Sequence, residues 1–420
     1  MIGFYRFLTS HCDWLLERIL RKRLARGKED AVRIDERRGI AAHARPDGKL
    51  LYLHAASVGE AQSALILIKA LLARYERLNI LVSTGTLTSA RLMANKLPDR
   101  AFHQFIPVDH PTWVARFLDH WKPDAAVWME SEFWPNMVLG LKQRGIPAAL
   151  VNGRLSERSF HKWRFFKRDL REILSAFDPV LAQTEGDARR FNAIGVAADN
   201  RDNVKYSAAP LPHDAADLKA LLTATMGRDI VVYASTHAGE EEIACRLHEQ
   251  IAATHPEALS IIIPRHPERG ESLDTGGLKT VIRGASKALP DTETQIYIAN
   301  TLGELGLFYR LGEIVYIGRS LSHDGGGGHN PIEAAQLGCA VLHGPNVQNL
   351  QEIFDDMAVA QACVFVADEG QLGTEISRLF NDEAARRDLI QNAHDFAMRK
   401  SHVIDDVMDE LTPMLEGLEI

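Results

Sequence analysis

Short apolar stretches alternate with amphipathic stretches along most of this 420-residue chain, and this alternation restricts the fold more than any other feature. Strands that alternate with helices favour a parallel, doubly wound α/β sheet. In the first half of the chain the predicted strands are Leu50–Leu53, Ile80–Ser83, His103–Ile106, Ala125–Trp128, Ala148–Val151, Pro179–Ala182 and Val204–Tyr206.

The same alternation begins again after a loosened stretch, Ser207–Asp217, whose prolines and small residues predict a linker. The second set of predicted strands is Ile230–Ala234, Ser260–Ile263, Lys279–Ile282, Gln295–Ile298, Ile314–Ile317, Ala340–Leu342 and Val364–Val366. We therefore expect two α/β domains that face a ligand-binding cleft. The tail, Glu383–Glu416, is helical in pattern and could cross back to the first domain.

Charge and cysteine content exclude several classes of function. The net charge of −8 argues against electrostatic binding of nucleic acid. The four cysteines lie far apart without a CxxC pair, which disfavours a zinc site or a disulfide framework and fits a reducing cytosol. Glu130 and Glu132 could form a metal pair, but no further acid or histidine cluster and no Asp-x-Asp supports one.

The first thirty residues combine an apolar stripe with a basic cluster. The apolar residues at helical spacing are Phe4, Tyr5, Leu8, Cys12, Leu15, Leu16, Ile19 and Leu20. The basic residues that follow are Arg18, Arg21, Lys22, Arg23, Arg26 and Lys28. Charged residues interrupt the stripe, so the pattern does not predict a spanning helix. It suits either a helix lying on an anionic membrane or a helix packed on its own domain.

The stretch from Leu53 to Glu60 predicts a strand, a tight loop of small residues and the start of a helix. Ser57 can cap that helix, and Gly59 allows a ligand or backbone to approach closely. Glu60 lies in the first helical turn, at a strand's carboxyl end, where open α/β sheets bind ligands. Its carboxylate could be a general base or could merely offset the helix dipole.

In the second half, three stretches combine groups that can hold a phosphate or a ribose. Ser235 and Thr236 precede an acidic helix start, and Arg265 follows the next predicted strand. Each also has an ordinary interpretation, as a helix cap or a surface arginine. The run Gly325–Gly328 is interpreted as a cradle for a ligand rather than a product of packing. After it, Asn330 is expected at the N-cap, Pro331 at the first helical position and Glu333 in the first turn, where its carboxylate can bind a ribose.

Taken together, these motifs resemble those of the Kdo transferases, which move 3-deoxy-D-manno-octulosonic acid (Kdo) from CMP-Kdo to lipid A precursor. The resemblance covers nearly the whole chain. The matching stretches are Phe4-Tyr5-Arg6, His54–Glu60, Ser83–Thr86, Pro107–Asp109, Glu130–Asn136, Asn152–Ser156, Ser235–His237 with Glu240-Glu241, Pro264–His266 and Gly327–Glu333. The pattern departs from the family at Asp202–Ser207, at Glu333-Ala334-Ala335 and in the length of the glycine run.

The resemblance implies a GT-B architecture, two Rossmann-like domains about a central cleft, and metal-free inverting transfer in lipopolysaccharide biosynthesis without a cofactor. Residues 1–30 would contact the cytoplasmic face of the inner membrane, 31–207 would bind the acceptor, 208–380 would bind CMP-Kdo and 381–420 would add C-terminal helices. Glu60 would be the general base. The acceptor side would include Ser57, Gly59, Glu130 and Arg154. The donor side would include Ser235, Thr236, Arg265, Gly326, Gly327, Gly328, Asn330 and Glu333.

Two alternatives stay open at this point. Another GT-B enzyme, such as a UDP-sugar transferase or a 2-epimerase, would share the fold and use a uridine-linked substrate. A non-catalytic nucleotide-binding protein docked on a membrane would bind CMP without turnover. The acids and hydroxyls predicted in both domains argue against the second alternative.

Overall fold

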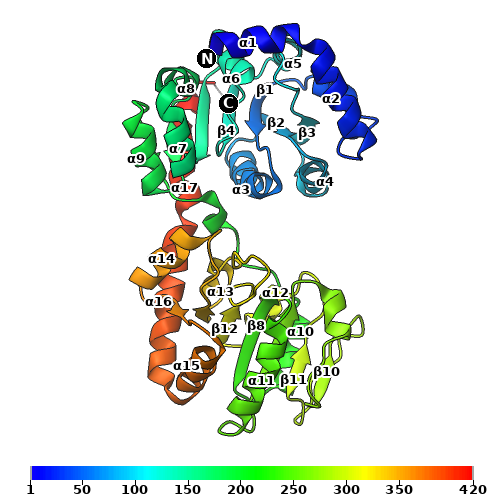
Figure 1. Cartoon of the computed structure of the whole chain (residues 1–420), viewed down its shortest axis with the longest axis vertical. Helices are drawn as coiled ribbons and strands as arrows, with labels where there is room; N and C mark the ends of the chain where they lie inside the picture. The colour runs from blue at the N-terminus through cyan, green and yellow to red at the C-terminus, as the bar shows by residue number, and fades with distance from the viewer. Residues whose placement is uncertain (1, 419–420) are drawn as a thin grey trace. The chain divides into compact units, whose positions relative to one another are not determined.

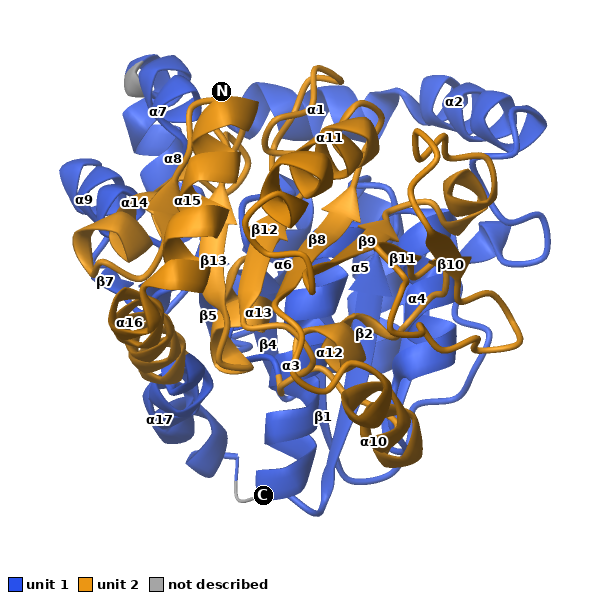
Figure 2. Ribbon diagram, turned by 90° about the horizontal axis from the view of Figure 1, so that it is seen from below, with its two compact units in different colours: residues 1–208, 401–420 blue, residues 209–400 orange. Residues whose placement is uncertain are grey.

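The computed structural model describes residues 2–418 and divides them into two compact units. Unit 1 comprises the described parts of residues 1–208 and 401–420, and unit 2 comprises residues 209–400 (Figure 2). The tail predicted for 381–420 is thus divided between the units, because the helix α16 (Glu383–Ser401) lies mainly in unit 2 and α17 (Val403–Glu416) lies in unit 1. None of the helices in residues 2–418 combines the length and apolar character needed to cross a membrane.

Unit 1 contains one parallel seven-stranded sheet in the order β3-β2-β1-β4-β5-β6-β7. Its strands are β1 (Lys49–His54), β2 (Leu78–Thr84), β3 (Ala101–Phe105), β4 (Ala125–Met129), β5 (Ala148–Gly153), β6 (Val180–Ala182) and β7 (Asp199–Asn200). Its helical segments are α1 (Ile2–His11), α2 (Asp13–Ala25), η1 (Ile34–Arg38), α3 (Val58–Arg74), α4 (Leu87–Lys96), α5 (Pro111–Trp121), α6 (Pro135–Gln143), α7 (Glu157–Trp163), η2 (Arg164–Phe166), α8 (Lys167–Leu174), α9 (Glu185–Ala193) and η3 (Val204–Ser207), besides α17.

Both faces of the unit 1 sheet are buried, which explains why its strands are continuously apolar. In β1, Leu51 and Leu53 pack on the face covered by α3, α4 and α17. Leu50 and Tyr52 point to the opposite face, where α5, α6, α8 and α9 contribute to the core. Successive side chains of the strand therefore alternate between two hydrophobic cores, one on each face of the sheet.

Unit 2 repeats this plan with a second parallel seven-stranded sheet, in the order β10-β11-β9-β8-β12-β13-β14. Its strands are β8 (Ile230–Thr236), β9 (Leu259–Pro264), β10 (Thr280–Ile282), β11 (Ile296–Ile298), β12 (Ile314–Ile317), β13 (Ala340–His343) and β14 (Val364–Phe365). Its helical segments are α10 (Ala215–Ala224), α11 (Glu240–Ala252), η4 (Pro267–Glu271), α12 (Leu305–Phe308), α13 (Ile332–Gln336), α14 (Gln351–Val359) and α15 (Glu369–Asn381), besides α16 (Figure 1).

Each sheet has a point where the order of its strands reverses. In unit 1 the chain runs outward through β1, β2 and β3 and then returns to place β4 on the other side of β1. In unit 2, β12 returns to the open side of β8 in the same way. Helix connections diverge at such a point, and open α/β sheets bind ligands there, beyond the carboxyl ends of the strands.

Two local predictions were wrong. The strand predicted for Val204–Tyr206 is the 3-10 segment η3, because Asn203 accepts from the Lys205 amide and turns the backbone. The last strand of the sheet is instead β7. The N-terminal apolar stripe forms two helices rather than one, with a break at Cys12 between α1 and α2.

Candidate active site

The loop after β1 places Glu60 at the reversal point of the unit 1 sheet. Ser57 is extended and caps α3, because its hydroxyl accepts from the Glu60 amide at 3.3 Å. The Glu60 carboxylate folds back over the loop, and its Oε2 accepts from the Ala56 amide at 2.7 Å. Only 6% of Glu60 is exposed. The carboxylate is thus fixed by the loop that precedes its own helix.

Burial of Glu60 raises the pKa of its carboxyl from the usual 4.5 to about 7. Repulsion from Glu130 is the next cause, and the hydrogen bond from Ala56 opposes both. A base is most effective when its pKa lies near the working pH. Dipole compensation alone requires an ionised carboxylate, so this environment favours the general-base interpretation.

Glu130 follows β4 and adopts a left-handed backbone, with φ of 59°. Non-glycine residues seldom adopt this conformation, and it is concentrated at functional sites. The Glu130 carboxylate lies 3.8 Å from the Lys205 ammonium of η3. A Cβ placed on Gly59 would lie 3.4 Å from the same ammonium, so Lys205 lies beside both predicted acceptor-side residues.

Sequence reasoning missed Lys205 as a site residue, because its stretch was predicted as a strand and departs from the family pattern. Side-chain hydrogen bonds hold the η3 turn in place. Asn152 at the end of β5 donates to Asn203 at 2.9 Å and accepts from the Val204 amide at 3.0 Å. The signal available in the sequence was the Asn-x-Lys spacing, since an asparagine often accepts from the backbone two residues on.

The Glu60 loop is also supported from β2. The Gly85 amide donates to the Ala56 carbonyl at 3.0 Å. The Gly85 carbonyl in turn accepts from the buried Arg37 guanidinium at 2.6 Å, and Glu29 holds that guanidinium by an ion pair. A Cβ on Gly85 would lie 3.1 Å from the Ala56 carbonyl, so glycine is required by this close approach.

Arg154 is exposed at the end of the β5 loop and lines a cavity of about 360 Å³. Its guanidinium has no hydrogen bond or ion pair within residues 2–418. The rest of the cavity wall combines polar, aromatic and aliphatic groups, from Ser131, Glu132, Phe133, Leu155, Ser156, Ser159 and Trp163. A free guanidinium, hydroxyls and aromatic rings are the groups that bind sugars and their anionic substituents.

In unit 2, Ser235 and Thr236 end β8 at the reversal point beside β12. Ser235 has a left-handed backbone with φ of 58°, and its carbonyl would lie 2.5 Å from a Cβ on Gly318. The Thr236 hydroxyl is buried and donates to Glu241 at 3.3 Å. The Thr236 side chain therefore has a partner within unit 2. Arg265 is exposed at the end of β9, and the Arg265 backbone amide donates to the Thr236 carbonyl.

Glu240 joins the loops that follow β8 and β12. It is 1% exposed, and its carboxylate accepts from the amides of His237, Arg319 and Leu321 at 2.9, 2.7 and 3.0 Å. The Tyr316 hydroxyl donates to it at 2.7 Å. One interpretation of the acidic helix start was a helix cap, and Glu242 provides it, because its Oε2 accepts from the Gly239 amide at 3.0 Å. Glu240 in addition holds the backbone of the reversal point.

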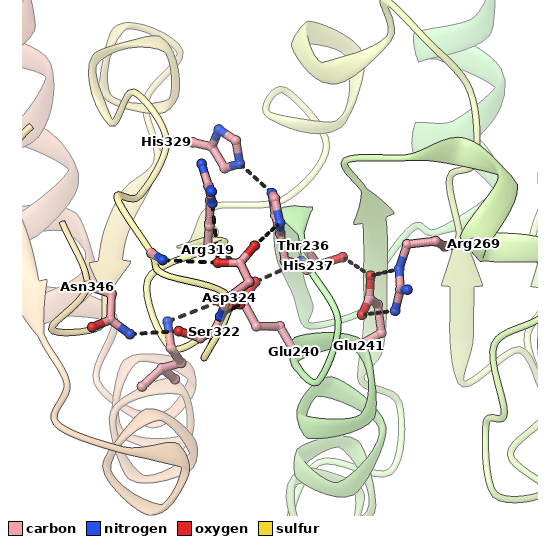
Figure 3. A network of polar contacts seen from close by, with 12 residues as sticks. Thr236, His237, Glu240, Glu241, Arg269, Arg319, Ser322, Asp324, His329 and Asn346 are labelled. Atoms are coloured by element: carbon pink, nitrogen blue, oxygen red, sulfur yellow. Dashed lines mark hydrogen bonds and ion pairs between the residues drawn. The ribbon is translucent and has the colours of Figure 1, made fainter. Parts of the chain in front are cut away.

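A network of side chains surrounds this buried carboxylate (Figure 3). His237 Nδ1 lies 2.8 Å from Asp324 Oδ2, and Arg319 approaches the same carboxylate at 3.4 Å. His329 Nε2 lies 3.3 Å from His237 Nε2. The Gly326 amide is the main group that lowers the pKa of Asp324, to about 2, so the network contains a permanent carboxylate among basic groups.

The glycine run has a packing role, which corrects the interpretation that packing does not explain it. A Cβ on Gly326 would lie 2.7 Å from the Asn346 side chain, and one on Gly327 would lie 2.2 Å from the Asn349 amide nitrogen. Gly328 is similarly close to Val347, at 3.1 Å. All three also have positive φ. These glycines are therefore required for the loop to lie against residues 346–349.

Asn330 and Glu333 come together at the start of α13. The helix begins at Ile332, one residue later than expected, yet the Asn330 side chain accepts from the Ile332 amide at 3.1 Å. Asn330 Nδ2 also lies 3.5 Å from Glu333 Oε1. Burial raises the pKa of the Glu333 carboxyl, and the asparagine opposes that shift. Residues 2–418 contain no group of three or more His, Cys, Asp and Glu side chains arranged to hold a metal ion.

Two doubly wound sheets, each with its polar residues gathered at the reversal point, define a GT-B fold of the kind used by sugar-nucleotide enzymes. Solved structures with this fold include a putative UDP-N-acetylglucosamine 2-epimerase from Listeria monocytogenes, with a TM-score of 0.58 and 12% identity, over 88% of this chain and 97% of that one. A glycosyltransferase from Rickettsia africae gives a TM-score of 0.55 at 10% identity, over 87% of this chain and 99% of that one. At such identities the likeness shows the fold alone.

Sequence comparison gives the family. Residues 32–208 match the model of the 3-deoxy-D-manno-octulosonic-acid transferase (kdotransferase) family. A 3-deoxy-D-manno-octulosonic acid transferase of Rickettsia bellii is 30% identical over 98% of this chain and 99% of its own length. One from Haemophilus influenzae is 30% identical over 98% of both chains. The chain belongs to the Kdo transferase family and is a glycosyltransferase.

Proposed function

We propose that this enzyme transfers Kdo from CMP-Kdo to lipid A precursor with inversion, in lipopolysaccharide biosynthesis, and that Glu60 is its general base. The observation that supports this most strongly is the Glu60 carboxyl itself. It is buried at the β1–β4 reversal point, held by the Ala56 amide and given a pKa of about 7. The proposal includes no metal ion and no cofactor.

In the proposed reaction an acceptor hydroxyl attacks the anomeric carbon of Kdo. The new carbon–oxygen bond forms as the bond to the CMP phosphate breaks, and the bonding electrons leave with the phosphate. Glu60 takes the proton of the attacking hydroxyl. A single displacement of this kind inverts the anomeric carbon and needs one base, whereas retention needs a second carboxylate as nucleophile.

Ser57, Gly59, Glu130 and Arg154 are proposed to position the acceptor in unit 1, with Lys205 beside them. The Arg154 guanidinium, which has no ion pair in the part of the chain that the structure describes, suits an anionic group of the acceptor. The Lys205 ammonium lies near Gly59 and Glu130. Its positive charge can offset the electrostatic repulsion between the Glu60 and Glu130 carboxylates.

The donor is proposed to bind unit 2 at the reversal point of its sheet. Arg265 and the loop amides would stabilise the charge that develops on the leaving phosphate, and Glu333 would accept from the ribose hydroxyls. The residues proposed for this side are Ser235, Thr236, Arg265, Gly326, Gly327, Gly328, Asn330 and Glu333. The half-buried Glu333 carboxyl and its Asn330 neighbour support the ribose assignment.

The lipid acceptor implies that the enzyme works at the cytoplasmic face of the inner membrane, with α1 and α2 as contacting elements. The Tyr5 hydroxyl donates to the buried Asp109 carboxylate at 2.9 Å, and Asp109 also accepts from the amides of Asn136 and Met137. These hydrogen bonds to Asp109 hold one side of α1 against the rest of unit 1. The exposed apolar residues that remain are Phe4, Phe7, Leu8, Trp14, Leu15 and Ile19.

The test is transfer of Kdo from CMP-Kdo, generated in place, to lipid A precursor, with product detected by mass. The intact enzyme is expected to form Kdo-bearing lipid, whereas Glu60→Ala is expected to bind CMP and form none. Glu157→Ala is the matched control, because that carboxylate is 81% exposed on α7. Normal turnover by Glu60→Ala would refute the assignment of Glu60 as the general base. If UDP rather than CMP competes with the donor, the alternative GT-B enzyme is favoured. If the intact enzyme binds CMP but forms no product, the non-catalytic alternative is favoured.

A further inference from the structure

Residues 158–168 form an exposed segment that is both aromatic and basic. Phe165 is 83% exposed and Phe166 is 45% exposed, in the short η2 turn between α7 and α8. The exposed basic residues of the segment include Arg158, Lys162, Lys167 and Arg168. The segment contains no acidic residue, although the whole chain carries a net charge of −8. A concentration of positive charge in an acidic protein indicates an anionic partner.

The backbone of this 158–168 segment is anchored, so its outward phenylalanines do not result from a detached loop. Phe160 and Trp163 pack against the unit 1 core, and Leu170 is buried directly behind the segment. Arg158, Lys162 and Lys167 form no ion pair within residues 2–418. A single exposed apolar side chain is ordinary, but two adjacent exposed phenylalanines with exposed cations before and after them in the sequence are typical of a membrane-surface segment.

The residue that follows the segment, Asp169, is hydrogen-bonded to the start of α1. The Ile2 amide donates to Asp169 Oδ1 at 2.9 Å, so the start of α1 lies at the start of α8 (Figure 1). Along α1, Phe4, Phe7 and Leu8 are 70%, 61% and 47% exposed. Two exposed apolar stretches from distant parts of the sequence therefore lie on elements that are joined by a hydrogen bond within unit 1.

We propose that the 158–168 segment is a second membrane-docking surface, which inserts Phe165 and Phe166 at the interface and binds anionic lipid headgroups with its cations. A second copy of this chain fits the segment poorly. In a symmetric dimer the same patch would face itself, and its cations would be opposed by cations. A bilayer that carries anionic lipid supplies both the apolar layer and the opposite charge.

The position of this surface also bears on the acceptor site, an argument that rests on the proposed function. Trp163 packs within the segment and lines the same cavity of about 360 Å³ as Arg154. Docking the segment would therefore place the mouth of that cavity at the lipid headgroups. A lipid acceptor could then present its polar head to Arg154 while its acyl chains stay in the bilayer.

The test measures binding of the full chain to vesicles by flotation, without donor or acceptor, so it does not depend on catalysis. The vesicles are phosphatidylcholine alone or phosphatidylcholine with about one third phosphatidylglycerol. The apolar variant is Phe165→Ser with Phe166→Ser, and the charge variant is Arg158→Gln, Lys162→Gln and Lys167→Gln. The control variant is Met226→Ser with Val359→Ser, whose side chains are 83% and 88% exposed in unit 2.

The apolar variant is expected to lose at least about tenfold in vesicle affinity. The charge variant is expected to lose about fivefold per cation on anionic vesicles and little on neutral ones. The control should match the intact enzyme, and all variants should keep its melting temperature, because the changed side chains are exposed. Transfer to acceptor dispersed in detergent should stay within about twofold for the apolar variant, whereas transfer to acceptor in vesicles should fall with binding.

Vesicle binding by both segment variants equal to that of the intact enzyme would overturn the proposal, as would loss of binding only in Phe4→Ser with Phe7→Ser. Dissociation of a dimer in sedimentation velocity by the apolar variant would also overturn it in favour of a second copy. If a segment variant that has lost vesicle binding also lost transfer in detergent, the link between docking and the acceptor cavity would be contradicted, while the docking surface would stand. The proposed reaction is tested separately, with Glu60→Ala.

Discussion

Replacing Glu60 by glutamine should stabilise the protein while it abolishes transfer. The glutamine carbonyl can still accept from the Ala56 amide, which Glu60 Oε2 does at 2.7 Å, so the loop keeps its hydrogen bond. What the substitution removes is the cost of a buried negative charge. A residue kept for chemistry rather than stability is expected to behave in this way.

The size of the effect follows from the pKa of Glu60, which the fold raises from 4.5 to about 7. A raised acid pKa means that the folded state prefers the protonated form, so folding stability is lost as pH rises from the unfolded pKa through the folded pKa. The loss is about 3 kcal/mol at pH 8 and below about 1 kcal/mol at pH 5. Glutamine does not titrate and should recover that difference.

The assay is thermal unfolding of intact enzyme, Glu60→Gln and the exposed control Glu157→Gln at pH 5 and pH 8. At 2–4 °C per kcal/mol for a unit of this size, Glu60→Gln should raise the melting temperature of unit 1 by about 6 °C or more at pH 8 and by about 3 °C or less at pH 5. For the intact enzyme, kcat/KM should rise with pH and level off above about 7. An equal change in melting temperature at both pH values, or lower stability at pH 8, would refute the reasoning.

Three further predictions concern neighbours of this site and the proposed donor site. Glu130→Gln removes the repulsion that is the second cause of the raised pKa of Glu60, so the rising limb of kcat/KM should move to lower pH; an unmoved limb would show that Glu130 does not act on Glu60. Gly85→Ala places a Cβ 3.1 Å from the Ala56 carbonyl and should lower kcat by about tenfold while CMP affinity is unchanged, as steady-state kinetics and calorimetry can check. Glu333→Gln should weaken CMP binding by roughly 10- to 100-fold in calorimetry, because a charged acceptor is lost, and should leave cytosine-base affinity unchanged. Equal CMP affinity would remove Glu333 from the ribose site.

The periodic segments were predictable because local pattern decides them. Every strand predicted from an apolar run in unit 2 lies within a residue or two of an observed strand, from β8 to β14. The strand prediction for Val204–Tyr206 was wrong because the Val204 and Lys205 amides donate to the side chains of Asn152 and Asn203, and these bonds override the apolar pattern. Lys205 was missed for the same reason, since its role depends on contacts with residues far away in the sequence.

The glycine run shows a second limit of sequence reasoning. Four consecutive glycines indicate that backbone must approach something closely, and the sequence does not reveal whether that is a ligand or another part of the chain. In the structure Gly326 and Gly327 lie against Asn346 and Asn349. Which part of the chain the glycines approach is decided by how the glycine loop packs against residues 346–349, and that is visible only in the tertiary structure.

The sequence by itself determined the fold class, the strand-end position of Glu60 and membership of the family, because all three depend on local order along the chain. The tertiary structure decided the electrostatics and the surfaces. The pKa of Glu60 depends on its burial and on Glu130, which reaches it from another strand. The start of α1 likewise lies at the start of α8 through a hydrogen bond between residues 167 positions apart in the sequence. Burial, charge coupling and adjacency are properties of distance in space, which sequence spacing does not specify.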